Sequence, residues 1–223
     1  MSDIRERSKY LAITILIGGK SSRFGSDKGL FQILGKPLIS YELEILEQLD
    51  YDIFLVAHSN EQVRNYLEKI NLSNVMAFII DNYLHEDNER IKTPLIGLYS
   101  AFKELNKLNY EKTLVLPCDT PLIQKNVINL LIHESIEYDC CIPRWNNGLL
   151  EPLIAIYPVK KAYKRSKQLL EEKNYKLINL LIKNWKINYI SIENSIQPQD
   201  LKLFSFININ EKSELDVIKT VIG

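Results

Sequence analysis

Residues 11–17 form an unbroken run of apolar, largely β-branched residues, LAITILI, that leads directly into a glycine-rich loop. A run without polar alternation predicts a strand covered on both faces, as in a parallel sheet. In the loop that follows, residues 18–30, glycines without a Cβ let backbone N–H groups approach a ligand closely. Arg23 and Lys28 add positive charge to the same loop. The stretch therefore predicts a buried strand followed by a loop that suits a polyphosphate.

Further apolar runs alternate with amphipathic segments as far as residue 143. Strands are expected at residues 51–57, 75–80, 113–116, 139–143, 152–157 and 187–192. Helices are expected from 36–37, at 61–70 with Asn60 as cap, from 93–94, at 124–135, 160–172 and 175–184, and from 211. Such alternation predicts an α/β fold, a mostly parallel sheet with helices on both faces. The strand at 152–157 follows a short loop, so it is expected to run antiparallel or to lie at the edge.

At 223 residues the chain is expected to form one domain, residues 1–223, with residues 1–9 as a flexible N-terminus. The 28 basic and 28 acidic residues balance, so no overall field favours nucleic acid or an anionic membrane as partner. No apolar run reaches the roughly 20 residues that span a bilayer, and the first ten residues lack the apolar core of a signal peptide. The three cysteines show neither metal-ligand spacing nor a disulfide framework, which predicts buried thiols in a cytoplasmic protein.

Polar residues at the ends of parallel strands are the candidates for a binding site, because ligands of open α/β sheets bind outside the carboxyl ends of the strands. These residues should share one rim, and they are Gly18–Lys28, His58–Asn60, Asp81 and Asp119. The polar loop at 81–92 is long enough to form part of that rim. His58 itself is expected to be an exposed loop residue.

Asp119 lies in the segment LVLPCDTPL, residues 114–122, with a proline on either side that restricts the backbone. A carboxylate at a strand tip offers the hard oxygen that Mg²⁺ requires when it binds a nucleoside triphosphate. The alternative is that Asp119 only caps the helix that follows it.

The loop GGKSSRFGSDKGL, residues 18–30, with GKPLI at 35–39, resembles the signature of the molybdenum cofactor guanylyltransferases, GGxSxRxGxDKGL. Neither the GxxxxGK[ST] loop of Walker-type NTPases nor the GxGxxG fingerprint of dinucleotide-binding folds occurs in the chain. The segment around Asp119 resembles the CDxP motif of the same family, whose aspartate binds magnesium.

Weaker matches follow the family in order along the chain. FININ and SEL, at 206–210 and 213–215, resemble its NxNTPEDL ending, TPLIG at 93–97 its GPLAG segment, and EPLIAIY at 151–157 its EPLxALY segment. The chain departs from the family at Ile17, where alanine is usual, and at Phe24, where methionine is usual. It also has AHSN at 57–60 in place of the family's NAN-like turn, which leaves base recognition open.

The resemblance implies a three-layer, Rossmann-like nucleotidyltransferase fold and transfer of GMP from GTP to molybdopterin, with or without its metal, with release of pyrophosphate. It implies Mg²⁺ as cofactor, a monomer, and transient contact with the enzymes that deliver molybdopterin. Arg23, Lys28 and Asp119 would be catalytic, Asp119 and Asn210 would hold the metal, and Glu151 and Asn208 would border the acceptor. The nucleotide would be bound by Leu16, Ile17, Gly18, Gly19, Ser21, Arg23, Lys28, Ser59, Asp81 and Asp119.

Two alternatives stay open on the sequence. One is a related enzyme that transfers CMP to molybdopterin or a nucleotide to a sugar or alcohol phosphate. The other is a nucleotide-binding domain that has kept the fold and lost the activity. Retention of Arg23, Lys28 and Asp119 together argues against the second alternative.

Overall fold

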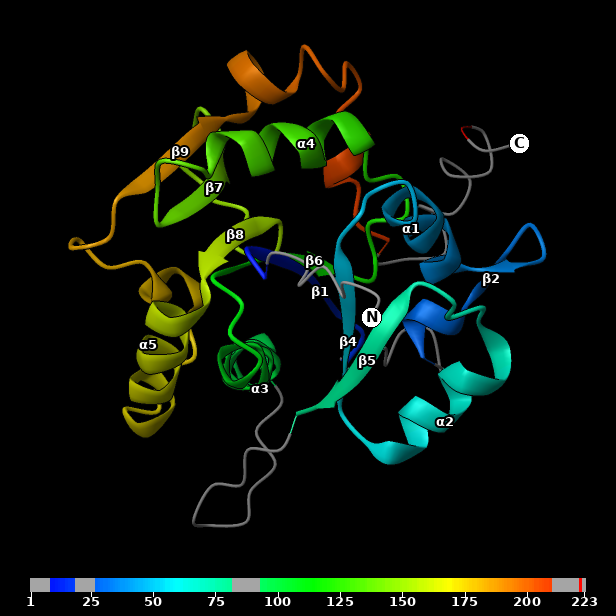
Figure 1. Cartoon of the computed structure of the whole chain (residues 1–223). Coiled ribbons are helices and arrows are strands. Elements are labelled where there is room, and N and C mark those ends of the chain that lie inside the picture. The colour runs from blue at the N-terminus through cyan, green and yellow to red at the C-terminus, as the bar shows by residue number, and fades with distance from the viewer. Residues whose placement is uncertain (1–8, 19–26, 82–92, 210–220, 222–223) are drawn as a thin grey trace, which may run out of the picture.

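The fold is built on a seven-stranded sheet with the strand order β5-β4-β1-β6-β8-β7-β9 (Figure 1). The computed structural model describes residues 9–18, 27–81, 93–209 and 221. The strands of the sheet are β1 (Leu11–Leu16), β4 (Asp52–Ala57), β5 (Val75–Ile80), β6 (Lys112–Pro117), β7 (Cys140–Arg144), β8 (Ala155–Pro158) and β9 (Ile187–Ser191). Strand β8 pairs antiparallel with β6 and β7, and the other neighbouring strands pair in parallel. The predicted fold class is therefore confirmed.

Helices cover both faces of the sheet, which gives three layers (Figure 1). One face carries α1 (Leu38–Leu46), α2 (Asn60–Lys69) and α4 (Lys125–Glu134), and the other carries α3 (Pro94–Lys107) and α5 (Val159–Glu171). Side chains of β1 alternate between the two cores, with Ile13 and Ile15 on the α1 side and Ala12 and Leu16 on the α3 side. All four are buried, which explains why the first strand reads as an unbroken apolar run.

The chain reverses direction across the sheet between β1 and β6. From β1 it proceeds through α1 to β4 and through α2 to β5, and α3 then returns it to β6 on the other side of β1. Ligands of open α/β sheets bind at such a switch point, outside the carboxyl ends of the strands. We call the edge at which the parallel strands end the carboxyl edge.

Two helix starts differ from the sequence-based expectation. Residues Lys36–Pro37 form β3, which pairs with β2 (Gln32–Ile33) across a tight turn, and α1 begins only at Leu38. The Leu38 N–H donates to the Phe31 carbonyl at 2.8 Å, so the strand pairing extends into the first helical residue. Helix α2 is capped by Ser59, whose Oγ accepts from the Gln62 N–H at 3.1 Å, and not by Asn60.

The predicted helix over 175–184 is wrong, because only the 3₁₀ turn η2 (Leu177–Leu180) forms there. The Asn179 side chain donates to Asn174 Oδ1 at 2.9 Å, and such local bonds compete with helix formation. Strand β8 begins at Ala155, later than expected, and lies between β6 and β7, so of the two expected arrangements it takes the antiparallel one.

The remaining short elements are η1 (Lys28–Leu30), the π-helix η3 (Ile192–Ile196) and η4 (Phe204–Phe206). The helix expected from Glu211 and the loop after Asp81 lie outside the described residues. Among the helices that the structure does describe, none has the length and apolar character needed to span a bilayer.

Candidate functional site

Three strand ends meet at the carboxyl edge beside β1. A Cβ built on Gly18, after β1, would lie 3.5 Å from the His58 backbone nitrogen and 3.6 Å from Asp81 Oδ2. The Asp81 N–H donates to the Ala57 carbonyl at 2.8 Å, which fixes Asp81 against the end of β4. The prediction that residues after β1, β4 and β5 share one rim is confirmed.

The end of a fourth strand, β6, lies at the same edge, and Asp119 after it forms an ion pair with Lys28 of the glycine-rich loop. Lys28 Nζ donates to Asp119 Oδ2 at 2.6 Å, although the two residues are 91 positions apart. Their side chains remain 15% and 22% exposed, so both can meet a ligand from solvent while the protein partly shields them. The predicted convergence of the glycine-rich loop and the strand-tip aspartate is confirmed at the switch point between β1 and β6.

The backbone around Asp119 is held from two sides. The Cys118 N–H donates to the Leu16 carbonyl at 3.2 Å, and the Ile209 N–H donates to the Asp119 carbonyl at 3.0 Å. Helix α4 begins at Lys125 with Gln124 in the cap position, so Asp119 is not the cap of that helix. The Asp119 carboxylate is directed instead toward Lys28.

The amides at the start of the loop are already paired. The N–H groups of Ile17 and Gly18 donate to the Val56 carbonyl at 3.0 and 3.1 Å. Gly18 is not among the described glycines with positive φ, so its missing Cβ matters for the space beside Asp81 and not for a left-handed turn. Amides that cradle a phosphate would have to come from later in the loop. Four predicted site residues lie outside the described residues, namely Gly19, Ser21, Arg23 and Asn210.

The side chains of Leu16 and Ile17 are nearly buried, with 7% and 3% exposure, and pack into the cores on opposite faces of the sheet. His58 is exposed, as expected of a loop residue, and Ser59 uses its hydroxyl to cap α2. The predicted nucleotide contacts of Leu16, Ile17 and Ser59 stay predictions.

Residues 208–209, near the C-terminus, lie next to Asp119 at the carboxyl edge. Asn208 is exposed, whereas its neighbour Ile209 is fully buried and makes the backbone bond to Asp119. The segment thus brings Asn208 within two residues of a direct contact with the strand tip. Asn208 therefore lies close to the strand tip in the chain, whereas its predicted role and that of Asn210 stay predictions.

Glu151 precedes β8, and because β8 runs antiparallel its beginning lies at the carboxyl edge. Glu151 Oε1 accepts a hydrogen bond from Trp145 Nε1 at 2.6 Å. The Trp145 ring packs edge-on against Phe206 with centroids 5.6 Å apart. Glu151 is therefore linked through one tryptophan to the segment that contains Asn208.

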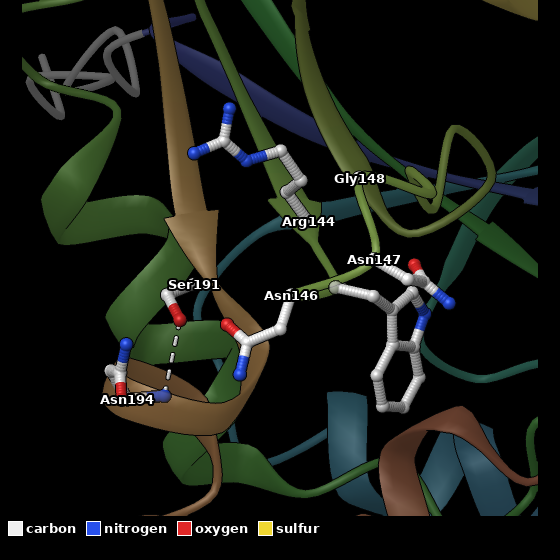
Figure 2. A pocket seen from close by; sticks show the side chains of 7 residues that line it. Arg144, Asn146, Asn147, Gly148, Ser191 and Asn194 are labelled. Carbon is white, nitrogen blue, oxygen red and sulfur yellow. Dashed lines mark hydrogen bonds between the residues drawn. The ribbon is translucent and has the colours of Figure 1, made fainter.

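A polar hollow of about 390 Å³ lies farther along the same edge, and the sequence-based reasoning did not find it. Figure 2 shows the side chain of Asn146 extending toward Ser191, which ends β9 and whose Oγ accepts from the Asn194 N–H at 3.1 Å. The hollow is lined by Arg144, Trp145, Asn146, Asn147, Gly148, Ser191 and Asn194. The turn sequence WNNG after a strand was the available signal.

Two buried titratable groups lie behind the ion pair. Burial, with Asp119 as a second cause, raises the pKa of Glu42 well above its usual range, and neither carboxylate oxygen has a hydrogen-bond partner. Burial also raises the pKa of the Cys118 thiol, with Asp119 adding to the effect. Both effects favour the protonated thiol of Cys118, which is buried. All three cysteines are buried and unpaired, as expected.

Comparison with known proteins agrees with this arrangement. Residues 13–184 match the protein family described as "MobA-like NTP transferase domain". A "Probable molybdenum cofactor guanylyltransferase" of Pyrococcus horikoshii is 34% identical over 216 residues, which cover 93% of this chain and 98% of the relative. A protein of the same name from Thermococcus gammatolerans is 34% identical over 210 residues, covering 90% and 95%.

The crystal structure of molybdopterin-guanine dinucleotide biosynthesis protein A from Archaeoglobus fulgidus superposes with a TM-score of 0.73 at 22% identity, covering 95% of this chain and 98% of that chain. The bifunctional IspDF of Campylobacter jejuni superposes with a TM-score of 0.65 at 18% identity, covering 93% of this chain and 53% of that one. At these identities the structures show a shared fold. The family match and the relatives show more: the chain belongs to the MobA-like NTP transferase family.

Proposed function

We propose that the protein is a molybdenum cofactor guanylyltransferase, which transfers GMP from GTP to molybdopterin and releases pyrophosphate. The observation that carries the proposal is the contact between Lys28 and Asp119 at the switch point of the sheet. A cation from the glycine-rich loop and a carboxylate from a strand tip meet there. The cation suits the phosphates of a nucleoside triphosphate, and the carboxylate suits the Mg²⁺ that accompanies it. The names of the relatives supply the substrate pair.

In this reaction the terminal phosphate of molybdopterin attacks the α-phosphorus of GTP. A new P–O bond forms, the bond from the α-phosphorus to the oxygen bridging to the β-phosphorus breaks, and pyrophosphate leaves with that electron pair. A phosphate monoester has a second pKa near 6, so the nucleophile is largely ionised at neutral pH without a strong general base. This agrees with a site in which His58 is exposed and Cys118 stays protonated.

The chain's own contribution is to position the triphosphate and to stabilise its charge. We assign Lys28 and Arg23 to the phosphates, where a preorganised cation stabilises charge that develops in the transition state. Gly18 leaves space beside Asp81 for the nucleotide, and Ser59 lies at the same rim. Asn208 and Glu151 border the acceptor, with the polar hollow beyond them available to its far end.

The described residues fit a magnesium ion that arrives with its nucleotide. No group of three His, Cys, Asp or Glu side chains that would hold a metal by itself occurs in the described part of the chain. Mg²⁺ usually takes only one or two carboxylates together with phosphates, and Asp119 offers such an oxygen. When bound there, Mg²⁺ would neutralise phosphate charge, with Asn210 as a further proposed ligand.

The test is pyrophosphate release from each of the four nucleoside triphosphates, with and without molybdopterin and its molybdenum-loaded form. We expect release with GTP that depends on the acceptor. Preference for CTP would refute the assignment of the base, and tight GTP binding without release would indicate a domain that has lost the activity.

Variants connect that activity to the site. Asp119→Asn and Lys28→Ala should each lower turnover by about 10²-fold or more while the far-UV circular dichroism stays unchanged. The matched control is Lys161→Ala, since Lys161 Nζ pairs with Asp139 Oδ1 at the same distance, 2.6 Å, away from the carboxyl edge. Wild-type rates in both site variants would refute the assignment.

A further inference from the structure

Two side chains of helix α2 contact Asp27 near the end of the glycine-rich loop, and the proposed reaction does not use them. Gln62 and Tyr66 lie one turn apart on the same face of the helix, and both are buried, with 3% and 0% exposure. They converge on Asp27, the residue directly before Lys28.

Asp27 accepts a set of hydrogen bonds that uses both of its carboxylate oxygens. Tyr66 Oη donates to Asp27 Oδ1 at 2.7 Å, and the Gly29 N–H donates to the same oxygen at 3.1 Å. Gln62 Nε2 donates to Asp27 Oδ2. Burial raises the pKa of Tyr66 far above its usual value, so its hydroxyl stays protonated and remains a donor.

Gln62 also holds the other end of the loop. Its Nε2 donates to the Ile17 carbonyl at 2.8 Å, and its Oε1 accepts from the His58 N–H at 2.9 Å. Ile17 directly precedes the loop and Asp27 lies near its end, so one buried amide ties the end of β1 to the residue that precedes Lys28. Both loop ends are thus fixed to α2.

Gly29 makes this arrangement sterically possible. A Cβ at position 29 would lie 2.2 Å from Tyr66 Oη and 3.2 Å from Tyr66 Cζ, a clash that any larger residue would create. The consecutive residues Asp27, Lys28 and Gly29 therefore have three separate tasks. Asp27 accepts the hydrogen bonds from α2, and Lys28 forms the ion pair with Asp119. Gly29 leaves space for the Tyr66 hydroxyl that donates to Asp27.

We propose that Asp27, Gln62 and Tyr66 form an anchor that fixes the backbone at Lys28, so that the Lys28 ammonium is preorganised opposite Asp119 for nucleotidyl transfer. Gln62 and Tyr66 are positioning residues, because they act on the reaction through Lys28. A lysine side chain has several rotatable bonds, and a cation held in place before the reaction stabilises the transition state better than a mobile one. The readout by turnover rests on the proposed function.

The decisive variant is Tyr66→Phe, which removes one hydroxyl and keeps the ring. We expect kcat to fall by about tenfold, with a smaller change in KM for GTP. In the Lys28→Ala background the same substitution should have no further effect, because the anchor acts through Lys28. An equal loss in the wild-type and Lys28→Ala backgrounds, or no loss in the wild-type background, would overturn the proposal.

Tyr110→Phe is the matched control. Tyr110 is also buried and also donates through its hydroxyl to an aspartate, Asp52, but at the opposite edge of the sheet, where β4 begins. It should lower stability without changing kcat or its dependence on Lys28. If Tyr110→Phe lowered kcat as much as Tyr66→Phe does, the loss would reflect a general loss of stability and not the anchor, and the proposal would be overturned.

A second readout needs no catalysis. The rate at which acetic anhydride labels Lys28, measured by mass spectrometry on the protein without nucleotide, should rise at least about threefold in Tyr66→Phe and in Gly29→Ala, as expected when a preorganised side chain is released. Labelling of Lys161 should not change. An unchanged Lys28 rate in both variants overturns the anchor, whereas a faster rate in a protein that transfers no nucleotide supports the anchor and refutes only the proposed function.

Discussion

Glu42 is predicted to destabilise the protein, and its replacement by methionine should make the protein more stable. The side chain lies on α1, is fully buried, and has no hydrogen-bond partner at either oxygen. A buried polar group without a partner costs about 1–3 kcal/mol. Methionine has a similar volume and no such requirement, so Glu42→Met should raise the free energy of unfolding by about that amount at pH 5.

The gain should grow with pH, because burial raises the pKa of Glu42 in the folded protein. As the pH rises past the usual glutamate value, the unfolded chain loses this proton while the folded protein keeps it. The unfolded state then binds fewer protons, so the wild-type free energy of unfolding falls with pH. The fall is at most about 1.4 kcal/mol per pH unit, and it continues until the pH reaches the raised pKa. Glu42→Met lacks this group and should lack this part of the pH dependence.

The assay is urea unfolding followed by circular dichroism at pH 5, 6, 7 and 8 for the wild type and the variant. The dependence of the unfolding free energy on urea should be unchanged, which shows that only stability differs. Glu44→Met, on the same helix but exposed and paired with Lys36, should change stability by no more than about 0.5 kcal/mol. A less stable Glu42→Met, or a gap that does not depend on pH, would show that Glu42 is ionised and paired, and the reasoning would be refuted.

Two further predictions concern the cap of α2 and the thiols. Ser59→Ala should lower stability by about 1 kcal/mol in thermal or urea unfolding, whereas Asn60→Ala should have little effect, because Ser59 makes the capping bond; the reverse order would contradict the observed cap. At pH 8 the three cysteines should resist iodoacetamide in the folded protein and react after denaturation, since burial raises the pKa of Cys118 and Cys140 and raises that of Cys141 to about 12. Fast alkylation of native protein, measured by mass spectrometry, would show that a thiol is accessible.

Strands β1, β4 and β6 could be predicted closely because each carries its own signal. A strand buried on both faces must be apolar throughout, so β1, β4 and β6 stand out from the sequence without any knowledge of their neighbours. The segment at 175–184 is also rich in apolar residues but forms only the 3₁₀ turn η2. Its Leu180 is buried by tertiary packing and not on the face of an α-helix. Periodicity does not separate these two causes.

Some residues of the candidate site could likewise be predicted from the local sequence, and others could not. Lys28 and Asp119 could be predicted because each follows a strand and their residue types fit a triphosphate. Gln62 and Tyr66 look like ordinary members of an amphipathic helix, and their task depends on contacts with Asp27, which lies 35 and 39 positions earlier. Long-range contacts of this kind leave no local pattern in a single sequence.

Strand direction explains why the proposed acceptor residues are harder to predict from the sequence than the proposed nucleotide-binding residues. The rule that functional residues follow their strands holds for parallel strands, whose carboxyl ends share one edge. Strand β8 runs the other way, so its contribution to that edge must precede it, and Glu151 does so. Beyond β8 the parallel direction returns, and Arg144 and Ser191 again occur at strand ends, beside the polar hollow. For an antiparallel strand such as β8, the residues at this edge therefore precede the strand. They can be predicted only when the direction in which the strand pairs is known.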